Sequence, residues 1–263
     1  MRKGLNSQGG HVPVSKNLFP CLYHAHHSLH MEDIPFWLEL AARQGSPILE
    51  LGCGTGRVLL ALAQAGYEVY GLDNDPGMLA VMRRRLNAGR PASIHILQAD
   101  LTNFRLQAHF ALVFLPCNTL STLAPGARRS MLERTAQHLL PGGLFAASLP
   151  NPALLTKLPA YSGPEVEETF PHPLDGEPVQ VSSAWKRTAR FFTLFWHYDH
   201  LLPDGQIERL NAQTRHHLDP AQTYLEELRH AGFEVVELFG DFQGVPYTED
   251  APSLILTAVR KAS

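Results

Sequence analysis

The chain has 263 residues, of which 44% are hydrophobic and 18% are charged, and its formal net charge is −3. This composition is typical of a globular protein and excludes a largely disordered chain, and the weak negative charge argues against a nucleic-acid-binding surface. Three cysteines without a CxxC pair predict reduced thiols, and the absence of a signal segment or an apolar run of about 18 residues predicts a soluble, cytoplasmic protein.

The first 150 residues alternate between strand and helix patterns. Residues 1–20 are polar and are expected to form a mobile arm, and the segment 1–30 as a whole is expected to be an N-terminal arm and lid. A first helix is predicted over 31–43 from the spacing of its apolar residues. Later strands are predicted at 47–51, 67–72, 93–98, 110–115 and 143–149, and later helices at 56–65, 76–87 and 126–139. This alternation predicts an α/β domain with a largely parallel sheet.

The sequence pattern changes after Pro150. Residues 150–178 hold seven of the 20 prolines and are expected to be an irregular crossing segment. Residues 179–217 have strand patterns with an Asp-Gly turn, so an antiparallel sheet is expected to be inserted over 151–217. The α/β pattern then resumes, so 31–150 and 218–263 are expected to form one domain. Its last elements are a helix from Pro220 to His230 with Asp219 as N-cap, and strands at 233–238 and 254–260.

The stretch "PILELGCGTGRVLL" places three glycines between a predicted strand and a predicted helix. Gly52, Gly54 and Gly56 lack a Cβ, so the backbone there can take positive φ and a ligand can lie against it. Ligands of open α/β sheets bind outside the carboxyl ends of the strands, where this loop falls. A nicotinamide fingerprint would need glycine at position 57, which is Arg57, whereas Glu50 within the strand completes the pattern E-x-G-x-G-x-G.

This stretch resembles motif I of the class I S-adenosylmethionine (SAM) dependent methyltransferases. The resemblance implies a Rossmann-like α/β fold with a seven-stranded, mostly parallel sheet whose last strand is antiparallel, and with an inserted antiparallel sheet as a lid. It also implies that Asp73, ending the second strand, holds the ribose hydroxyls of SAM, because a carboxylate can accept from both. Asp100, ending the third strand, and the amide of Leu101 would contact the adenine.

The resemblance covers residues 20–262 and extends to small-molecule methyltransferases with an antiparallel sheet over the active site. Aminosugar N,N-dimethyltransferases and glycine and sarcosine methyltransferases are among them. It implies in-line transfer of a methyl group from SAM to a nitrogen or oxygen of a small molecule. Leu115, Pro116 and Asn118 would form the wall beside the sulfonium. Thr122 stands where the aminosugar enzymes carry a histidine, and this departure weakens the case for a sugar amine as the acceptor.

Two sets of candidate residues follow from the resemblance. The cofactor set is Glu50, Gly52, Gly54, Gly56, Asp73, Asn74, Met78, Asp100, Leu101 and Leu115. No catalytic residue is assigned, and the candidates for acceptor contact are Tyr23, Asn118, His197, Tyr198 and Tyr247.

A metal site is considered at His26 and His30, whose spacing of four lets both imidazoles face one ion. No acidic or cysteine partner follows at ligand spacing, and HExxH is absent, so no metal is predicted.

The sequence leaves two alternative functions open. An NAD(P)-dependent oxidoreductase and a non-catalytic SAM-binding regulator are the alternatives. The partners expected are a small-molecule acceptor, no nucleic acid and no membrane, in a monomer or homodimer. The basic run 83–85 is interpreted as a solvated helix face.

Overall fold

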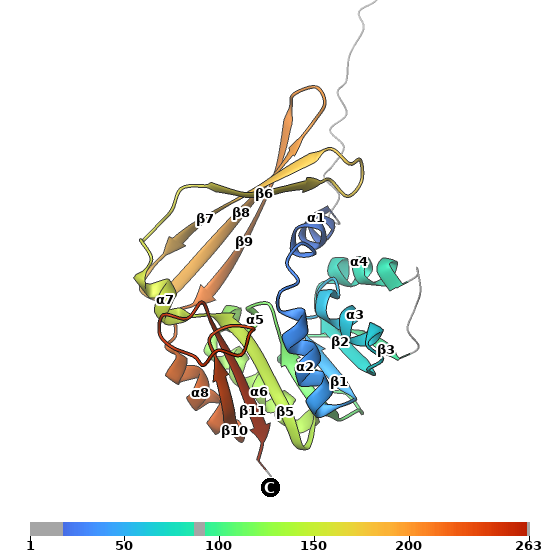
Figure 1. The fold of residues 1–263 in the computed structure, drawn as a ribbon, viewed down its shortest axis with the longest axis vertical. Helices are drawn as coiled ribbons and strands as arrows, with labels where there is room; N and C mark the ends of the chain where they lie inside the picture. The colour runs from blue at the N-terminus through green and yellow to red at the C-terminus, as the bar shows by residue number, and fades with distance from the viewer. Residues whose placement is uncertain (1–17, 87–92, 262–263) are drawn as a thin grey trace, which may run out of the picture.

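The computed structural model describes residues 18–86 and 93–261, so most of the predicted arm over residues 1–20, and the last residue of the helix predicted over 76–87, lie outside it. Its lower half in Figure 1 is a seven-stranded sheet in the order β10-β11-β5-β4-β1-β2-β3. The strand β11 runs antiparallel to both of its neighbours, as predicted. The seven strands are β1 (Ile48–Leu51), β2 (Val69–Asp73), β3 (Ile94–Gln98), β4 (Phe110–Leu115), β5 (Leu139–Pro150), β10 (Phe233–Phe239) and β11 (Ser253–Arg260).

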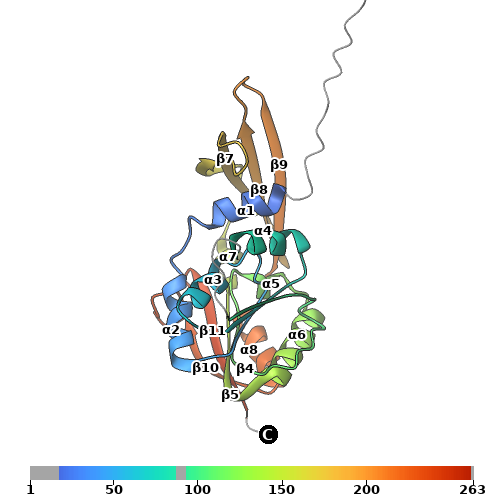
Figure 2. The same cartoon turned by 90° about the vertical axis from the view of Figure 1, so that its right-hand side faces the viewer.

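Helices cover both faces of this sheet (Figure 2). Ile48 packs in the core beneath one set of helices, and its neighbour Leu49 packs beneath the other, because successive side chains of a strand point to opposite faces. Both faces are therefore apolar, as expected of a buried parallel sheet. The first set is α2 (Ile34–Gln44), α3 (Arg57–Gln64) and α4 (Pro76–Leu86), and the second is α5 (Thr119–Thr122), α6 (Pro125–His138) and α8 (Ala221–His230).

The strand order reverses direction between β1 and β4. The chain moves outward from β1 through β2 to β3, then returns to β4 on the other side of β1. At such a switch point the loops leave the two strands on opposite faces of the sheet and open a crevice for a ligand. The loop after β1 carries the three glycines, and the loop after β4 carries Cys117 and Asn118.

A separate four-stranded antiparallel sheet stands above this crevice in Figure 1, and it is called the inserted sheet below. The expectation that 150–178 is irregular was wrong, because α7 (Pro152–Lys157) and β6 lie within it. Asn151 caps α7 by accepting a 3.0 Å hydrogen bond from Ala153 N, and the prolines at 171 and 178 pair with each other at the strand ends. The inserted sheet consists of β6 (Glu165–Pro171), β7 (Pro178–Arg187), β8 (Phe191–Leu201) and β9 (Ile207–His217).

A helix that the sequence pattern did not predict, α1 (Leu18–His27), precedes α2. It lies between the inserted sheet and α4 in both views (Figures 1 and 2). Its Leu22 is buried in a small core with residues of β6, β7 and β8, including Phe170 and Tyr198. The helix is therefore packed against the inserted sheet and forms part of the wall of the crevice.

The start of α8 also differs from the prediction. Pro220 is the N-cap, and Asp219 makes no capping bond. Asp219 instead accepts a 2.7 Å hydrogen bond from Arg128, a fully buried side chain that also pairs with Glu227. A buried guanidinium needs charged partners, and this requirement outweighs the local capping preference. Within the two described ranges, no helix has the length and apolar character needed to cross a membrane.

Candidate active site

The glycine loop between β1 and α3 takes the left-handed conformation at all three glycines. Gly52, Gly54 and Gly56 have φ of 68°, 52° and 80°. A Cβ on Gly56 would also lie 2.9 Å from Met82 Cγ, so both conformation and packing favour glycine there. The three glycines leave the backbone without side chains at the end of β1, so a ligand can lie against it there.

Asp73 at the end of β2 holds this loop in place. Its Oδ2 accepts a 2.8 Å hydrogen bond from Gly54 N, and its Oδ1 accepts one of 2.8 Å from Asp75 N. Burial raises the pKa of Asp73, and the backbone donors partly offset this effect. Each carboxylate oxygen has a further lone pair, so Asp73 could also accept from a pair of ribose hydroxyls.

The other predicted adenosine contacts follow the same sheet edge. Asp73 pairs in register with Gln98, so Asp100 comes shortly after the neighbouring strand ends. Asp100 is exposed, and hydrogen bonds from the hydroxyl and the amide of Thr102 lower its pKa. The exposed Asn74 and the half-buried Met78 follow β2, and the half-buried Leu101 follows Asp100.

Glu50 lies at the floor of a cavity along the glycine loop, called the glycine-loop cavity. It is 2% exposed, and its Oε2 makes no hydrogen bond within the described part of the chain. Burial raises its pKa well above the ordinary value, so a cation is needed beside it to stabilise the anion. The cavity is lined by Tyr23, His24, His27, Ser28, Glu50, Gly52, Cys53, Gly54, Thr55, Arg57, Val58, Cys117 and Thr119.

A second cavity of about 370 Å³, called the lid cavity, lies against the inserted sheet. It shares four wall residues with the glycine-loop cavity: Tyr23, His27, Arg57 and Cys117. The two cavities therefore meet at one wall. The remaining lining residues are His30, Glu32, Asp33, Asn118, Ser148, Leu194, Trp196, Thr214, His216, Phe242 and Ser253.

The turn after β4 is strained where it borders the lid cavity. Cys117 and Asn118 have φ of 59° and 64°, in the left-handed region that non-glycine residues rarely adopt. Asparagine tolerates this conformation, whereas cysteine does not favour it. Backbone strain of this kind concentrates at functional sites, where the surrounding structure maintains it.

Arg57 ties the glycine loop to the segment between α1 and α2. Its guanidinium forms a two-point ion pair with Asp33, and its Nη1 also donates to the carbonyl of His30 at 2.8 Å. Asp33 is fixed in turn by Trp37, whose Nε1 donates to it at 2.9 Å. The residue that departs from the nicotinamide fingerprint therefore positions the wall between the two cavities.

The structure brings some of the predicted acceptor contacts to the lid cavity. Tyr23 and Asn118 line it. Tyr198 is buried behind α1, where its hydroxyl lies 3.1 Å from His26 Nδ1. His197 is on the other face of β8, 2.6 Å from Asn211, and the Tyr247 hydroxyl donates to Asn151 at 2.9 Å. Neither His197 nor Tyr247 lines either cavity.

Four residues of the inserted sheet line the lid cavity and were not among the predicted contacts: Leu194, Trp196, Thr214 and His216. Trp196 is on the same face of β8 as Leu194, which also lines the lid cavity, and strand parity alone could not say that this face points inward. His216 comes from β9 and pairs in register with Phe192. Only the pairing of β8 with β9 places this histidine beside the turn after β4.

His216 is held in one tautomer by its neighbours. Its Nδ1 lies 2.9 Å from Ser121 Oγ, and this hydroxyl donates its one hydrogen to the carbonyl of Asn118. Nδ1 therefore carries the proton and donates to Ser121, so Nε2 keeps a free lone pair. Burial lowers the pKa of His216 to about 4, and the imidazole is neutral near pH 7. Thr122, in contrast, caps its own helix by donating to Thr119 and does not line the lid cavity.

The burial of His216 predicts a pH-dependent contribution to stability. Because its folded pKa of about 4 is below the unfolded value, the unfolded state binds more protons below pH 6.5. The free energy of unfolding therefore decreases as the pH falls, and His216 accounts for about 2 kcal/mol of this decrease between pH 7 and pH 5. His216→Gln should remove this loss, measured by denaturant unfolding at both pH values. His230→Gln, at the exposed end of α8, should leave it unchanged, and equal pH dependence in wild type and His216→Gln would refute the assignment.

Comparison with known proteins identifies the family of this fold and site. A family of methyltransferase domains matches residues 48–143, which include the glycine loop, Asp73 and the end of β4. The chain is a class I SAM-dependent methyltransferase. This assignment confirms the predicted fold, the enzyme class and the SAM cofactor, and it replaces the oxidoreductase alternative.

The similarity of this methyltransferase to individual relatives extends beyond the cofactor motifs. It is 24% identical over 223 residues to the cypemycin N-terminal methyltransferase of a Streptomyces species, covering 82% of this chain and 84% of that protein. A SAM-dependent methyltransferase from Clostridium acetobutylicum superposes with a TM-score of 0.78 and 12% identity, covering 94% and 99% of the two chains. SAM-bound CalS10, an amino pentose methyltransferase from Micromonospora echinaspora, superposes with a TM-score of 0.71 and 20% identity, covering 99% and 100%.

The residues of this methyltransferase fit the cofactor. Glu50 Oε2, which has no hydrogen-bond partner among the described residues, could pair with a cationic amino group, and the glycine loop offers a backbone surface without side chains. Asp73 offers two oxygens to vicinal hydroxyls. SAM carries an amino group and a ribose, so Glu50, the loop and Asp73 together match its polar groups.

Proposed function

We propose that this methyltransferase transfers the methyl group of SAM to a nitrogen or oxygen of a small molecule bound in the lid cavity. The observation that carries the proposal is the wall shared by the two cavities. Tyr23, His27, Arg57 and Cys117 border both, so an acceptor in the lid cavity would lie next to the methionine end of SAM.

The size and the roof of the lid cavity support a compact acceptor. Its volume of about 370 Å³ is within the range of small-molecule sites, about 300–1,000 Å³. The inserted sheet contributes Leu194, Trp196, Thr214 and His216 to its lining and so covers it. A duplex or a folded protein surface would need an open, flat approach, which this roof obstructs.

The side chains of the lid cavity can orient an acceptor for in-line displacement. SAM supplies the methyl group already activated as a sulfonium, so the protein must align the acceptor's lone pair and exclude water. The Asn118 amide can donate to or accept from a polar group of the acceptor. His216 Nε2 can accept a hydrogen bond from the acceptor's N–H or O–H and so direct its lone pair.

A nitrogen acceptor fits this cavity better than an oxygen acceptor. A hydroxyl needs a base to increase its nucleophilicity, whereas an amine need only be bound in its neutral form. His216, with a pKa of about 4, is too weak a base to activate a hydroxyl. The Glu32 carboxylate and the Trp196 ring line the same cavity and can attract an amine in its ammonium form, by charge and by cation–π attraction. The amine then loses its proton to water before its lone pair can attack. The relatives named as a cypemycin N-terminal methyltransferase and an amino pentose methyltransferase support the same preference.

The test is a comparison of matched acceptors. Purified enzyme is incubated with SAM and pairs of small compounds that differ only in carrying an amine or a hydroxyl, and S-adenosylhomocysteine and methylated product are measured by mass spectrometry. We expect equal amounts of the two products from amines, and a rate that rises with pH until the amine is neutral. Transfer only to hydroxyls would overturn the preference for nitrogen. SAM binding without turnover on any small acceptor would favour the regulator instead.

A further inference from the structure

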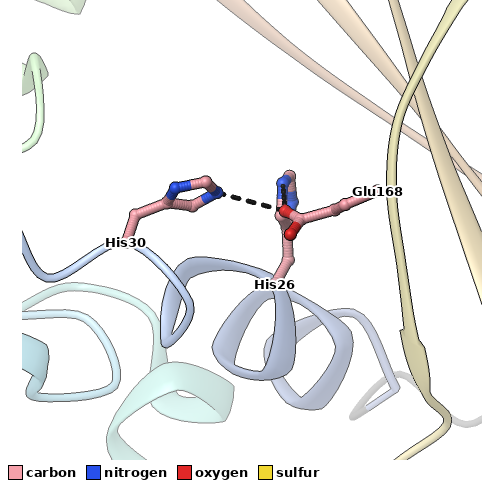
Figure 3. A group of neighbouring side chains, drawn as sticks. All are labelled: His26, His30 and Glu168. Atoms are coloured by element: carbon pink, nitrogen blue, oxygen red, sulfur yellow. Dashed lines mark hydrogen bonds and ion pairs between the residues drawn. The ribbon is translucent and has the colours of Figure 1, made fainter.

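A cluster of metal-ligating side chains joins α1 to the inserted sheet beside the lid cavity. His26 Nε2 lies 2.9 Å from Glu168 Oε1, and His30 Nε2 lies 3.1 Å from the same oxygen. Figure 3 shows the imidazoles of His26, in α1, and of His30, just after α1, converging with the carboxylate of Glu168 in β6. The expectation of no metal was based on a missing acidic partner, and Glu168 supplies that partner from β6 of the inserted sheet.

A β-bulge in β6 directs a second carboxylate to the cluster. Val166 pairs with Ser182 and Glu168 with Val181, so Glu167 is the extra residue of the bulge. A bulge breaks the alternation of side chains, and Glu167 Oε2 accordingly lies 3.6 Å from His26 Nε2. Two successive carboxylates thus face one imidazole, and within the described ranges neither pairs with a lysine or arginine.

The buried histidine is held in an orientation suited to a ligand. His26 is 2% exposed, and its Nδ1 lies 3.1 Å from the buried hydroxyl of Tyr198. A tyrosine hydroxyl can accept from Nδ1–H, which leaves the Nε2 lone pair free for an ion. Metal-binding histidines almost always have their second nitrogen fixed by such a partner.

The spacing and chemistry of the donor atoms suit a zinc-like ion. The ligand atoms of His26, His30 and Glu168 all lie within 4.8 Å of one another. Bonds of 2.0–2.2 Å in a tetrahedron place donor atoms roughly 3.4 Å apart, so small side-chain shifts would accommodate the ion. Two imidazoles with carboxylate oxygens are typical ligands of zinc, whereas calcium and magnesium require oxygen ligands.

We propose that a divalent zinc-like ion binds His26, His30 and Glu168 and fastens α1 to the inserted sheet. The helix α1 carries Tyr23 and His27, which border both cavities, and His30 itself lines the lid cavity. The ion would therefore hold the roof and the wall of the acceptor site together. Its role is positional, since methyl transfer from a sulfonium needs no Lewis acid.

The test measures binding of Zn²⁺ to the chelator-treated full chain by calorimetry, and of Co²⁺ by visible absorption. We expect saturable binding that Glu168→Gln and His30→Ala each weaken at least a hundredfold. The control Glu165→Gln, an exposed glutamate of the same strand, should retain it. A hundredfold excess of Zn²⁺ over its Kd should raise the Tm of wild type by about 5 °C, and raise that of Glu168→Gln far less.

The experiment must also separate this cluster from a second one. His172, Asp175 and His200 lie at the far end of β6 and β8 and also have donor atoms within 4.8 Å. Asp175→Ala should leave Zn²⁺ binding at His26, His30 and Glu168 unchanged. The proposal is overturned if wild type binds no ion, or if binding is lost in Asp175→Ala and kept in both Glu168→Gln and His30→Ala. Because His30 and Asp175 are exposed, both variants should fold, and circular dichroism checks this.

Discussion

Asp73→Asn should weaken SAM binding by at least about a hundredfold. The carboxylate would lose charge-assisted hydrogen bonds to the ribose, each contributing about 1.5–3 kcal/mol, and two such bonds correspond to a factor of 100 or more in Kd. Asparagine keeps one oxygen that can still accept from Gly54 N, so the glycine loop should stay folded. Isothermal titration with SAM measures the effect.

The matched control for this variant is Asp204→Asn. Asp204 is in the exposed turn between β8 and β9, where its carboxylate accepts from Gln206 N, and it lines neither cavity. The control should bind SAM as wild type does. An unchanged SAM affinity in Asp73→Asn, with both variants folded, would show that the end of β2 does not hold the cofactor.

Trp196→Ala should lower kcat/KM for the acceptor by about 30–150-fold while SAM affinity stays the same. Trp196 lines the lid cavity and not the glycine-loop cavity, so its loss removes aromatic surface from the acceptor alone. Truncating a large aromatic anchor at a binding site costs about 2–3 kcal/mol, which corresponds to this range. Steady-state kinetics with the preferred amine, and titration with SAM, separate the two effects.

The inserted sheet offers a second tryptophan as the control. Trp185 in β7 is also half-buried, but it packs against Phe192, and its Nε1 donates to the Pro159 carbonyl at 3.3 Å. Trp185→Ala should lower stability without changing kcat/KM beyond twofold. Equal losses of activity in both variants would mean that the inserted sheet contributes only to folding, and that the acceptor lies elsewhere.

The cofactor half of the site follows from local sequence because each of its parts ends a strand. An apolar run followed by glycines at alternate positions predicts a strand and then a tight loop. Both elements depend only on residues that are close together in the sequence. Glu50, Asp73 and Asp100 could then be placed on one edge, since parallel strands end at the same side of a sheet. The family assignment confirms the fold and the cofactor that this pattern predicted.

The acceptor half depended on contacts that no local pattern encodes. A strand shows which residues share a face, but not which face is turned inward, so Trp196 and His197 could not be distinguished before β8 was placed above the crevice. The i, i+4 spacing of His26 and His30 was visible in the sequence, whereas Glu168 follows His30 by 138 positions. Its carboxylate reaches the imidazoles only because α1 packs against β6 in the tertiary structure. Local sequence therefore determined the loop that binds the cofactor, and only the tertiary packing of the inserted sheet decided which side chains surround the acceptor.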